Sequence, residues 1–314
     1  MKHLITITIL TACTKLCAQF APAAGISGST AIHGDSSCFV GWGISSQLNV
    51  GLRQIDVVDS GWAAVGNENS AVGKSRKNGV VSLGDGGSAL VYFNPPIMDG
   101  PGFDFAVFEN AFNDSFLELA HVEISENGVD FYRFPSVSLT QIDSQTASFG
   151  PTFPENIHNL AGKYRMPYGT PFDISEIISP DLPLKFHYVK INDVVGSINP
   201  LLGTIDSKGN IINDPWPTNF ASSGFDLDAI GVINQGTFNG LTSPEKEKMV
   251  IFNDQDKELT ALQNLENIQI VASNGTLVGE RNNLERGNKI DLSHLPEGIY
   301  IIRSQSTFQR ISIQ

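Results

Sequence analysis

Two aspartates in the segment 225–229 have the residue type and spacing of a metal site. The run Phe225-Asp226-Leu227-Asp228-Ala229 alternates apolar and acidic residues. Such alternation predicts a strand with Asp226 and Asp228 on one face, roughly 7 Å apart. Carboxylates this close repel each other unless something neutralises them. Ca²⁺ does so well, because it takes six to eight oxygen ligands.

Three polar residues in the stretch 103–110 are candidates to complete this calcium site. Asp104, Glu109 and Asn110 flank an apolar run that we predict to be another strand, so that they would reach the metal from a strand end. The alternative is that all these acids accept hydrogen bonds from loop amides or face the solvent. Both interpretations remain open at the level of sequence.

A second candidate site consists of aromatic residues in loop-like sequence. Stacking of a sugar or another flat ligand needs exposed rings and a few polar groups beside them. The residues of this type are Trp62, Trp216, Tyr164, Tyr168 and Arg165. The alternative is that these rings cover the ends of the fold as part of its core.

Signatures of catalysis are absent from the sequence. It contains no G-x-S-x-G, H-E-x-x-H or G-x-x-x-x-G-K-[ST] pattern, and its histidines have no metal-type spacing. His121 and Glu123 share a strand face, a pair that many sheets contain by chance. We therefore expect no catalytic residue. A glycosidase needs only two carboxylates about 5–10 Å apart, so a secreted hydrolase is kept as an alternative.

Composition limits the class of protein. The 314 residues include 41% hydrophobic residues, enough for a packed core, which excludes wholesale disorder. A net charge of -13 makes nucleic acid an unsuitable partner. The 30 glycines and 16 prolines, with few charges, favour many short strands and turns.

The elements that must position the candidate residues are strands. Stretches of apolar alternation separated by turn residues lie at 80–83, 89–93, 103–110, 120–125, 131–134, 186–191 and 225–233. The Pro95-Pro96 pair should end the second of them. Prolines such as Pro151, Pro154, Pro167 and Pro171 give residues 136–180 a turn-like composition, which predicts a surface excursion with one short helix at 173–178. This pattern predicts an antiparallel β-sandwich over residues 19–235.

The N-terminal 18 residues have the features of a secretory signal peptide. A basic start, a short apolar stretch and Ala18 at the cut predict cleavage there. A lipobox-like Leu10-Thr11-Ala12-Cys13 would instead give a lipidated Cys13. Cleavage after Ala18 leaves Cys38 as the last cysteine, which excludes an intrachain disulfide, and we expect it to be buried. No later stretch reaches the roughly 20 apolar residues of a transmembrane helix.

A polar segment, 236–249, predicts a linker, and residues 250–314 follow as a compact block. Strands are indicated at 268–271, 289–292, 299–302 and 308–313, with a hairpin turn at Asn274-Gly275. This density of strands predicts a small Ig-like β-sandwich of the seven-strand type.

This C-terminal block resembles the type A C-terminal sorting domain of the type IX secretion system of Bacteroidota. The resemblance rests on Ile268-Gln269-Ile270, Ile290-Asp291-Leu292-Ser293, Leu295-Pro296-Glu297-Gly298-Ile299-Tyr300 and the final strand 308–313. It implies that the type IX machinery is a partner. It also implies passage across the outer membrane after periplasmic export, with a secreted or surface-attached product.

The first domain resembles galactose-binding-like and discoidin-type jelly rolls over residues 78–235. The matching segments are 104–110, the strand and turn at 120–131, and 224–230. The resemblance implies a jelly-roll-like β-sandwich, a fold that commonly holds a structural calcium. We therefore expect a non-catalytic binding module with a glycan as its first candidate ligand. A polysaccharide hydrolase and a structural adhesion component are the alternatives.

Overall fold

Antiparallel strands form the part of the chain that the structure describes. The computed structural model describes residues 20–236 and 249–313, except 254, 274, 275, 305 and 306. The predicted signal peptide, the lipobox alternative and the Asn274-Gly275 turn lie outside these residues. The prediction of an all-β protein is confirmed, because helices within the described residues are short 3-10 turns: η1 (Val58–Ser60), η2 (Glu68–Ala71), η3 (Pro154–Asn156) and η4 (Ile174–Glu176).

The first domain contains a six-stranded sheet. Its strands are β1 (Ile32–His33), β2 (Gly41–Trp42), β4 (Val81–Ser82), β6 (Phe105–Glu109), β11 (Tyr168–Phe172) and β13 (Asp226–Val232). Their order is β1-β11-β6-β13-β2, with β4 also paired to β13. The two strands that carry the predicted metal ligands, β6 and β13, are therefore neighbours at the centre of this sheet.

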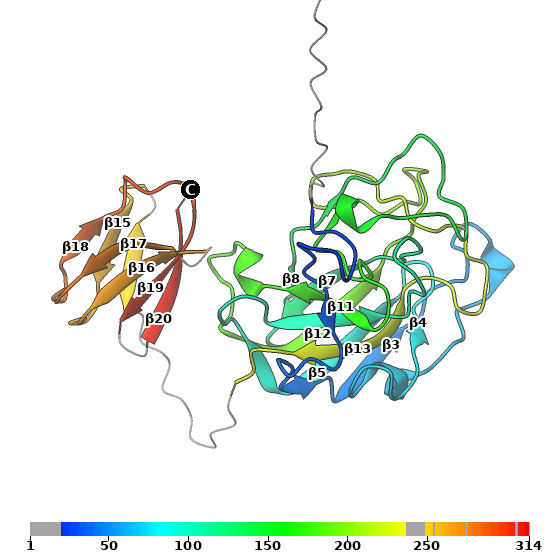
Figure 1. Ribbon diagram of the computed structural model, residues 1–314, viewed down its shortest axis with the longest axis horizontal. Helices are drawn as coiled ribbons and strands as arrows, with labels where there is room; N and C mark the ends of the chain where they lie inside the picture. Colours follow the sequence, from blue (N-terminus) through cyan, green and yellow to red (C-terminus); the bar gives the residue numbers. More distant parts are fainter. Residues whose placement is uncertain (1–19, 237–248, 254, 274–275, 305–306, 314) are drawn as a thin grey trace, which may run out of the picture.

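A five-stranded sheet packs against it. Its order is β3-β5-β12-β7-β8, and its strands are β3 (Ser45–Asn49), β5 (Ser88–Met98), β7 (Ala120–Ser125), β8 (Tyr132–Arg133) and β12 (Lys185–Asp193). Buried side chains of both sheets, such as Phe105 and Val107 from β6 and Ile191 from β12, form one continuous core. Two-layer packing of antiparallel sheets is the predicted sandwich. The yellow β13 crosses the first domain in Figure 1.

The segment 136–180 differs from its prediction as a surface excursion. It supplies the small pair β9 (Val137–Ser138) and β10 (Ile157–His158), and it supplies β11, which pairs with β6. Phe172 and Ile174 are fully buried. The prolines of this segment predicted turns and no strands. The strands gave no pattern in the sequence, because each strand is short and is stabilised by partners distant in the chain. The short helix predicted at 173–178 is the single turn η4.

Two further expectations are wrong in detail. β5 continues through Pro95 and Pro96 instead of ending there. Opposite these prolines, the pairing with β12 shifts register between Phe186 and Tyr188. The ladder therefore requires no backbone N–H from either proline. Cys38 is half-buried rather than buried, since it lies in the loop between β1 and β2, and its sulfur accepts a hydrogen bond from Ser36.

A bulge in β13 changes the faces of the predicted strand. The register with β6 shifts between Leu227 and Ala229. Leu227 therefore packs in the main core, whereas Ala229 packs with Ala106 and Phe108 on the other side of the sheet. The sequence alternation had placed Leu227 and Ala229 on one face.

The C-terminal domain consists of a three-stranded and a four-stranded sheet. The first has the order β14 (Val250–Asn253), β15 (Glu258–Ala261), β18 (Lys289–Asp291). The second has the order β17 (Leu277–Arg281), β16 (Ile268–Ala272), β19 (Gly298–Ser304), β20 (Thr307–Ile313). Residues such as Ile270, Tyr300 and Ile302 fill a separate core, which Met249 joins. Figure 1 shows this domain in orange and red beside the first. Within the described residues, no helix has the length and apolar character needed to cross a membrane.

Candidate functional site

Both predicted aspartates of β13 are buried, and each has hydrogen-bond donors. Asp226 accepts hydrogen bonds from the Ser82 hydroxyl and from the Asn110 side chain. Asp228 accepts one from the Ser75 hydroxyl at 2.5 Å and one from the Arg76 backbone N–H at 2.9 Å. Burial raises the pKa of Asp226 to about 6, against the lowering effect of Ser82 and Asn110.

Glu109 lies beside these aspartates at the end of β6. It pairs in register with Leu227, and its carboxylate accepts the Ala111 N–H at 2.7 Å. Complete burial, followed by the charge of Asp226, raises the pKa of Glu109 well above its ordinary value. The structure therefore brings together Asp226, Glu109 and Asn110, three of the five residues that the calcium interpretation named.

Glu118, which sequence reasoning missed, also faces this group. It precedes β7, and its residue is 9% exposed. Among the described residues no hydrogen-bond donor reaches its carboxylate, and the charges that act most strongly on it are carboxylates. Burial, then Glu109 and Asp226, raise the pKa of Glu118 well above its ordinary value. A signal was present, because Glu118 interrupts the apolar run Leu117-Glu118-Leu119.

Asp193 and Asp214 extend the group toward the loops. Asp193, at the end of β12, accepts the N–H groups of Gly86 at 3.0 Å and Phe225 at 2.8 Å. Asp214 accepts the Leu119 N–H at 2.9 Å. Burial raises the pKa of both carboxyls well above their ordinary values. We name the set Glu109, Glu118, Asp193, Asp214 and Asp226 the carboxylate cluster.

The carboxylate cluster can hold a cation only with help from other oxygens. Among the described residues, three carboxylates bring oxygens within 4.8 Å of one another only at Asp99, Asp104 and Asp173, outside this cluster. A cation here would therefore bind one or two carboxylates directly. Ca²⁺ tolerates such a set, because carbonyl oxygens, the Asn110 amide and water can complete its shell.

Asp104, a predicted ligand of the same site, lies at the other end of β6. It is completely buried and accepts hydrogen bonds from the N–H of Gly100 and Ile174 and from the Asn234 amide. Its neighbours are Asp99 and Asp173, and we name these three residues the acidic triad. The structure therefore does not place Asp104 with Glu109.

The predicted aromatic ligand residues do not form one platform. Tyr164 is 1% exposed, and its hydroxyl pairs with Thr30 at 2.8 Å, so this ring belongs to the core. Tyr168 is half-buried against His33, and the Arg165 guanidinium lies 5.4 Å from its ring centre. Arg165 in turn pairs with Asp114.

The two predicted tryptophans have different environments. The Trp216 indole donates a hydrogen bond to Asp85 at 3.0 Å and is half-buried. Trp62 is 64% exposed, and its carbonyl accepts a hydrogen bond from Arg53. Trp216 therefore supports a loop, whereas the Trp62 ring is available to a ligand.

An aromatic row that the sequence analysis did not single out lies on three loops of the first domain. The rings of Phe116 and Phe149 lie 5.8 Å apart, and those of Phe149 and Phe220 lie 5.6 Å apart. Phe149 is 74% and Phe220 44% exposed. We name these three rings the phenylalanine row. The Ser148 hydroxyl ties two of its loops together by donating to the Pro217 carbonyl at 2.6 Å.

His121 and Glu123 are both committed to structural contacts. Burial lowers the pKa of His121 to about 4, and its ring nitrogens contact the Ile205 carbonyl and the Ser136 hydroxyl. Glu123 forms an ion pair with Arg133 at 2.7 Å. Both side chains therefore have partners within the first domain.

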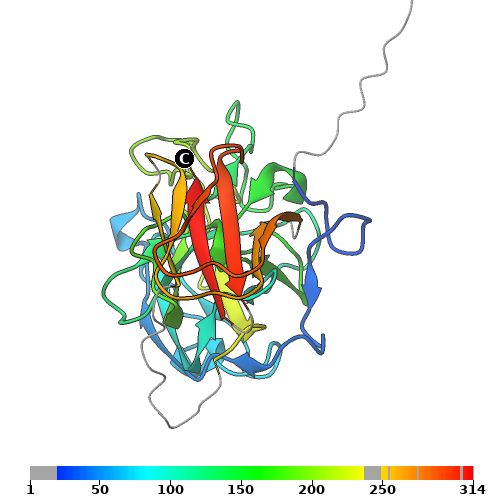
Figure 2. The same ribbon diagram turned by 90° about the vertical axis from the view of Figure 1, so that its left-hand side faces the viewer.

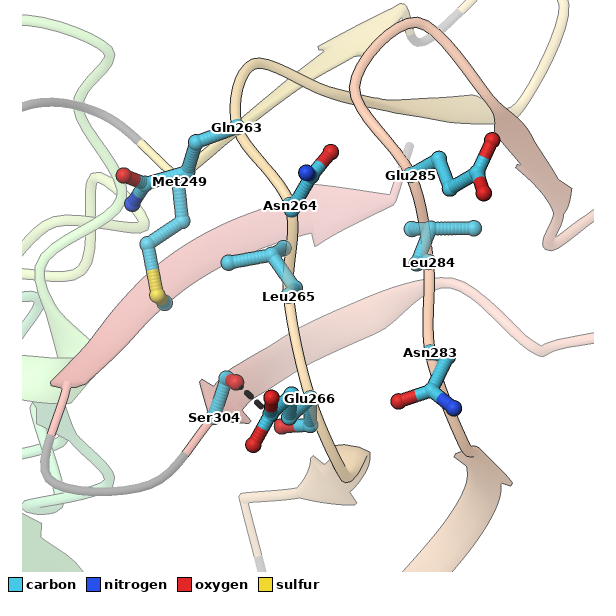
Figure 3. A pocket seen from close by; sticks show the side chains of 9 residues that line it. All are labelled: Met249, Gln263, Asn264, Leu265, Glu266, Asn283, Leu284, Glu285 and Ser304. Atoms are coloured by element: carbon cyan, nitrogen blue, oxygen red, sulfur yellow. Dashed lines mark hydrogen bonds between the residues drawn. The ribbon is translucent and has the colours of Figure 1, made fainter.

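One hollow of about 470 Å³ lies in the C-terminal domain (Figure 3). Two residues that line it, Leu265 and Leu284, exchange backbone N–H to carbonyl hydrogen bonds. The Ser304 hydroxyl donates a hydrogen bond to the Glu266 backbone carbonyl. It contains none of the predicted site residues.

The C-terminal domain matches a known family. Residues 243–313 match the family model described as a secretion system C-terminal sorting domain. This confirms the predicted sorting domain, marks the chain as cargo of the type IX secretion system, and implies a secreted or cell-surface protein. No curated protein and no solved structure matches the chain.

Proposed function

We propose that the first domain is a non-catalytic binding module that meets its ligand through the loops of the phenylalanine row and is stabilised beside them by a divalent cation. The observation that carries this proposal is the position of the carboxylate cluster among the loops of the phenylalanine row. Glu118 follows Phe116 by two residues, and Asp214 precedes Phe220 by six. A cation at the cluster would therefore fix the loops that present the aromatic rings.

The cation is supported by the electrostatics of the carboxylate cluster. Buried carboxylates must be protonated or neutralised, because burial without a counter-charge costs several kcal/mol. The strongest charges around Glu118 are four other carboxylates, which raise its pKa together with burial. Ca²⁺ is the cation that an extracellular site of oxygen ligands fits best.

The phenylalanine row supports a ligand with a flat apolar face. Exposed apolar patches on a protein surface mark interaction sites more often than isolated apolar residues do. A glycan is the ligand class we propose first, because the apolar face of a sugar ring can stack on such rings. Exposed Trp62 adds an indole to the rings available on this domain.

A non-catalytic role is supported by the burial of the acids. A glycosidase needs two carboxyl groups that touch the scissile bond. Glu109 is 3% and Asp226 8% exposed, so neither reaches a polymer at the surface.

The cation is tested by thermal unfolding of the chain without residues 1–18. Tryptophan fluorescence reports the first domain alone, because Trp42, Trp62 and Trp216 all lie in it. A cation that binds only the folded state adds about 2.7 kcal/mol at one hundred times its Kd. We expect CaCl₂ to raise the Tm above its value in EDTA. Glu109→Gln should abolish this rise, and the exposed Asp143→Asn should keep it. An equal Tm in both buffers would contradict the cation.

The ligand is tested by affinity electrophoresis in gels that contain a soluble β-glucan, xylan or chitosan. We expect retardation by at least one polymer, lost in Phe149→Ala and kept in Phe112→Ala, whose ring is 75% exposed outside the row. Shortening of the polymer would instead support the hydrolase. Absence of retardation in all gels would remove glycans from the proposal and favour a structural or protein-binding role.

A further inference from the structure

Arg310 is placed on the face of β20 that looks away from the core of the sorting domain. Its neighbour Ile311 and the next alternate residue, Ile313, are buried in that core. Strand alternation puts the Arg310 side chain on the opposite face. β20 is the strand of the sorting domain that lies next to the first domain in Figure 1, and the two domains overlap in the perpendicular view of Figure 2.

The Arg310 guanidinium contacts three groups of the first domain. It donates hydrogen bonds to the backbone carbonyls of Ile174, at 3.3 Å, and Ile177. It also lies 3.9 Å from the Asp99 carboxylate. The Arg310 side chain is only 18% exposed, although it comes from a separate domain.

The acidic triad builds the receiving surface. Buried Asp104 accepts the Ile174 N–H at 2.7 Å and so fixes η4 to the start of β6. Asp173 caps η4 by accepting the Ser175 N–H at 2.9 Å. The carbonyls of Ile174 and Ile177 are thereby held beside Asp99 only when β6 and η4 have reached their final positions.

The charges of the two sides are complementary. Oxygens of Asp99, Asp104 and Asp173 lie within 4.8 Å of one another, and the charges of Asp99 and Asp173 act on Arg310. Burial raises the pKa of Asp99 to about 6, and Arg310 acts against this rise. Burial lowers the pKa of Arg310, and the charges of Asp99 and Asp173 act against this fall.

We propose that Asp99, Asp173 and the carbonyls of Ile174 and Ile177 form a guanidinium socket that docks the sorting domain on the folded first domain through Arg310. A planar guanidinium suits this socket, because its five N–H donors reach carbonyl and carboxylate oxygens at the same time. Docking depends on the folded first domain, since the socket combines Asp99 with the distant segment 173–177. In the docked state, the first domain covers the outer face of β20 around Arg310.

The docking is tested by small-angle X-ray scattering of the chain without residues 1–18. We expect a compact particle for the natural sequence. Arg310→Ala should increase the radius of gyration and the maximum dimension, and Arg310→Lys should do so less, because a lysine keeps the charge but lacks the fork. Arg303→Ala is the matched control. Arg303 lies on the adjacent β19 and contacts Gln269 within its own domain, so its loss should leave the scattering unchanged.

A second variant tests the socket from the first domain. Asp99→Asn should extend the particle as Arg310→Ala does, and it replaces that variant if Arg310→Ala fails to fold by circular dichroism. High NaCl should extend the natural chain, because salt screens a partly exposed ion pair. An extended natural chain at low salt would overturn the proposal. Equal scattering of Arg310→Ala and Arg303→Ala with an unchanged Asp99→Asn would overturn it as well.

Discussion

Asp104 and Glu109 lie at opposite ends of one strand, β6, and their carboxylates belong to two separate acidic groups. Five residues of extended chain separate them by about 16 Å. Glu109 faces Asp226 and the carboxylate cluster, whereas Asp104 supports the acidic triad and η4. One β-strand therefore organises the proposed cation site at one end and the proposed docking socket at the other.

Glu118→Gln should stabilise the first domain when divalent cations are removed. Its carboxylate has no donor among the described residues, and Asp226 and Glu109 repel its charge. We expect the free energy of unfolding in EDTA to rise by about 1–2 kcal/mol, or a few degrees in Tm. The stabilisation by CaCl₂ should shrink. Exposed Glu68→Gln is the control and should change neither quantity. A lower Tm of Glu118→Gln in EDTA would contradict the predicted repulsion of its charge by Glu109 and Asp226.

The stability of the first domain in EDTA should fall as pH rises from about 6.5 to about 8. Burial raises the pKa of Asp104 from 3.8 to about 8, so the folded state holds more protons than the unfolded state within this range. His121 acts in the opposite direction, but only between about 4 and 6.5, since burial lowers its pKa. Urea unfolding followed by tryptophan fluorescence should show a loss of about 1–2 kcal/mol.

Burial also raises the pKa of the cluster carboxyls Glu109, Glu118, Asp193 and Asp214, which add to this loss. CaCl₂ should remove their part of the pH dependence, because a bound cation holds them ionised. It should leave the part due to Asp104, which lies outside the carboxylate cluster. A stability that rises with pH between 6.5 and 8 in EDTA would show that these buried acids are ionised at little cost.

Gly162→Ala should damage the backbone beside Glu118. Gly162 has a φ of +83°, and a Cβ at this position would meet the Glu118 carbonyl oxygen at 1.9 Å. Gly102 has a φ of +76° with open space around it. Gly102→Ala should therefore cost only about 1–2 kcal/mol for the left-handed backbone, and Gly162→Ala clearly more. Urea unfolding of both variants checks this difference, and equal losses would refute the close approach.

Trp216→Phe should destabilise the first domain by about 1–2 kcal/mol. The substitution removes the indole N–H that Asp85 accepts at 3.0 Å, and Asp85 is buried. Trp62→Phe should change stability by less than about 0.5 kcal/mol, because its ring is exposed. Differential scanning calorimetry distinguishes the two variants. If Trp62→Phe is the more damaging one, then the two tryptophans have been assigned the wrong roles.

Local sequence patterns predicted where the strands lie, but they did not predict which side chains of different strands are in contact. The alternation at 120–125 coincides with β7, and that at 225–233 contains β13. Pro95 wrongly predicted the end of β5, because a register shift in the pairing with the distant strand β12 accommodates this proline. Glu118 and Asp193 were missed although each interrupts an apolar run, because an acid inside such a run indicates burial without indicating its partners.

Alternation in the sequence was enough to predict the all-β class, and its final motifs were enough to predict the sorting domain, expected at residues 250–314 and matched at 243–313. These properties depend on alternation, turn residues and motifs that lie close together along the chain. Only the tertiary structure decided which carboxylates meet. Glu118 and Asp226 are more than one hundred residues apart in sequence, and strand pairing between different segments sets their proximity. The tertiary structure also separates Asp104 from Glu109, because the extended backbone of β6 holds the residues at its two ends far apart.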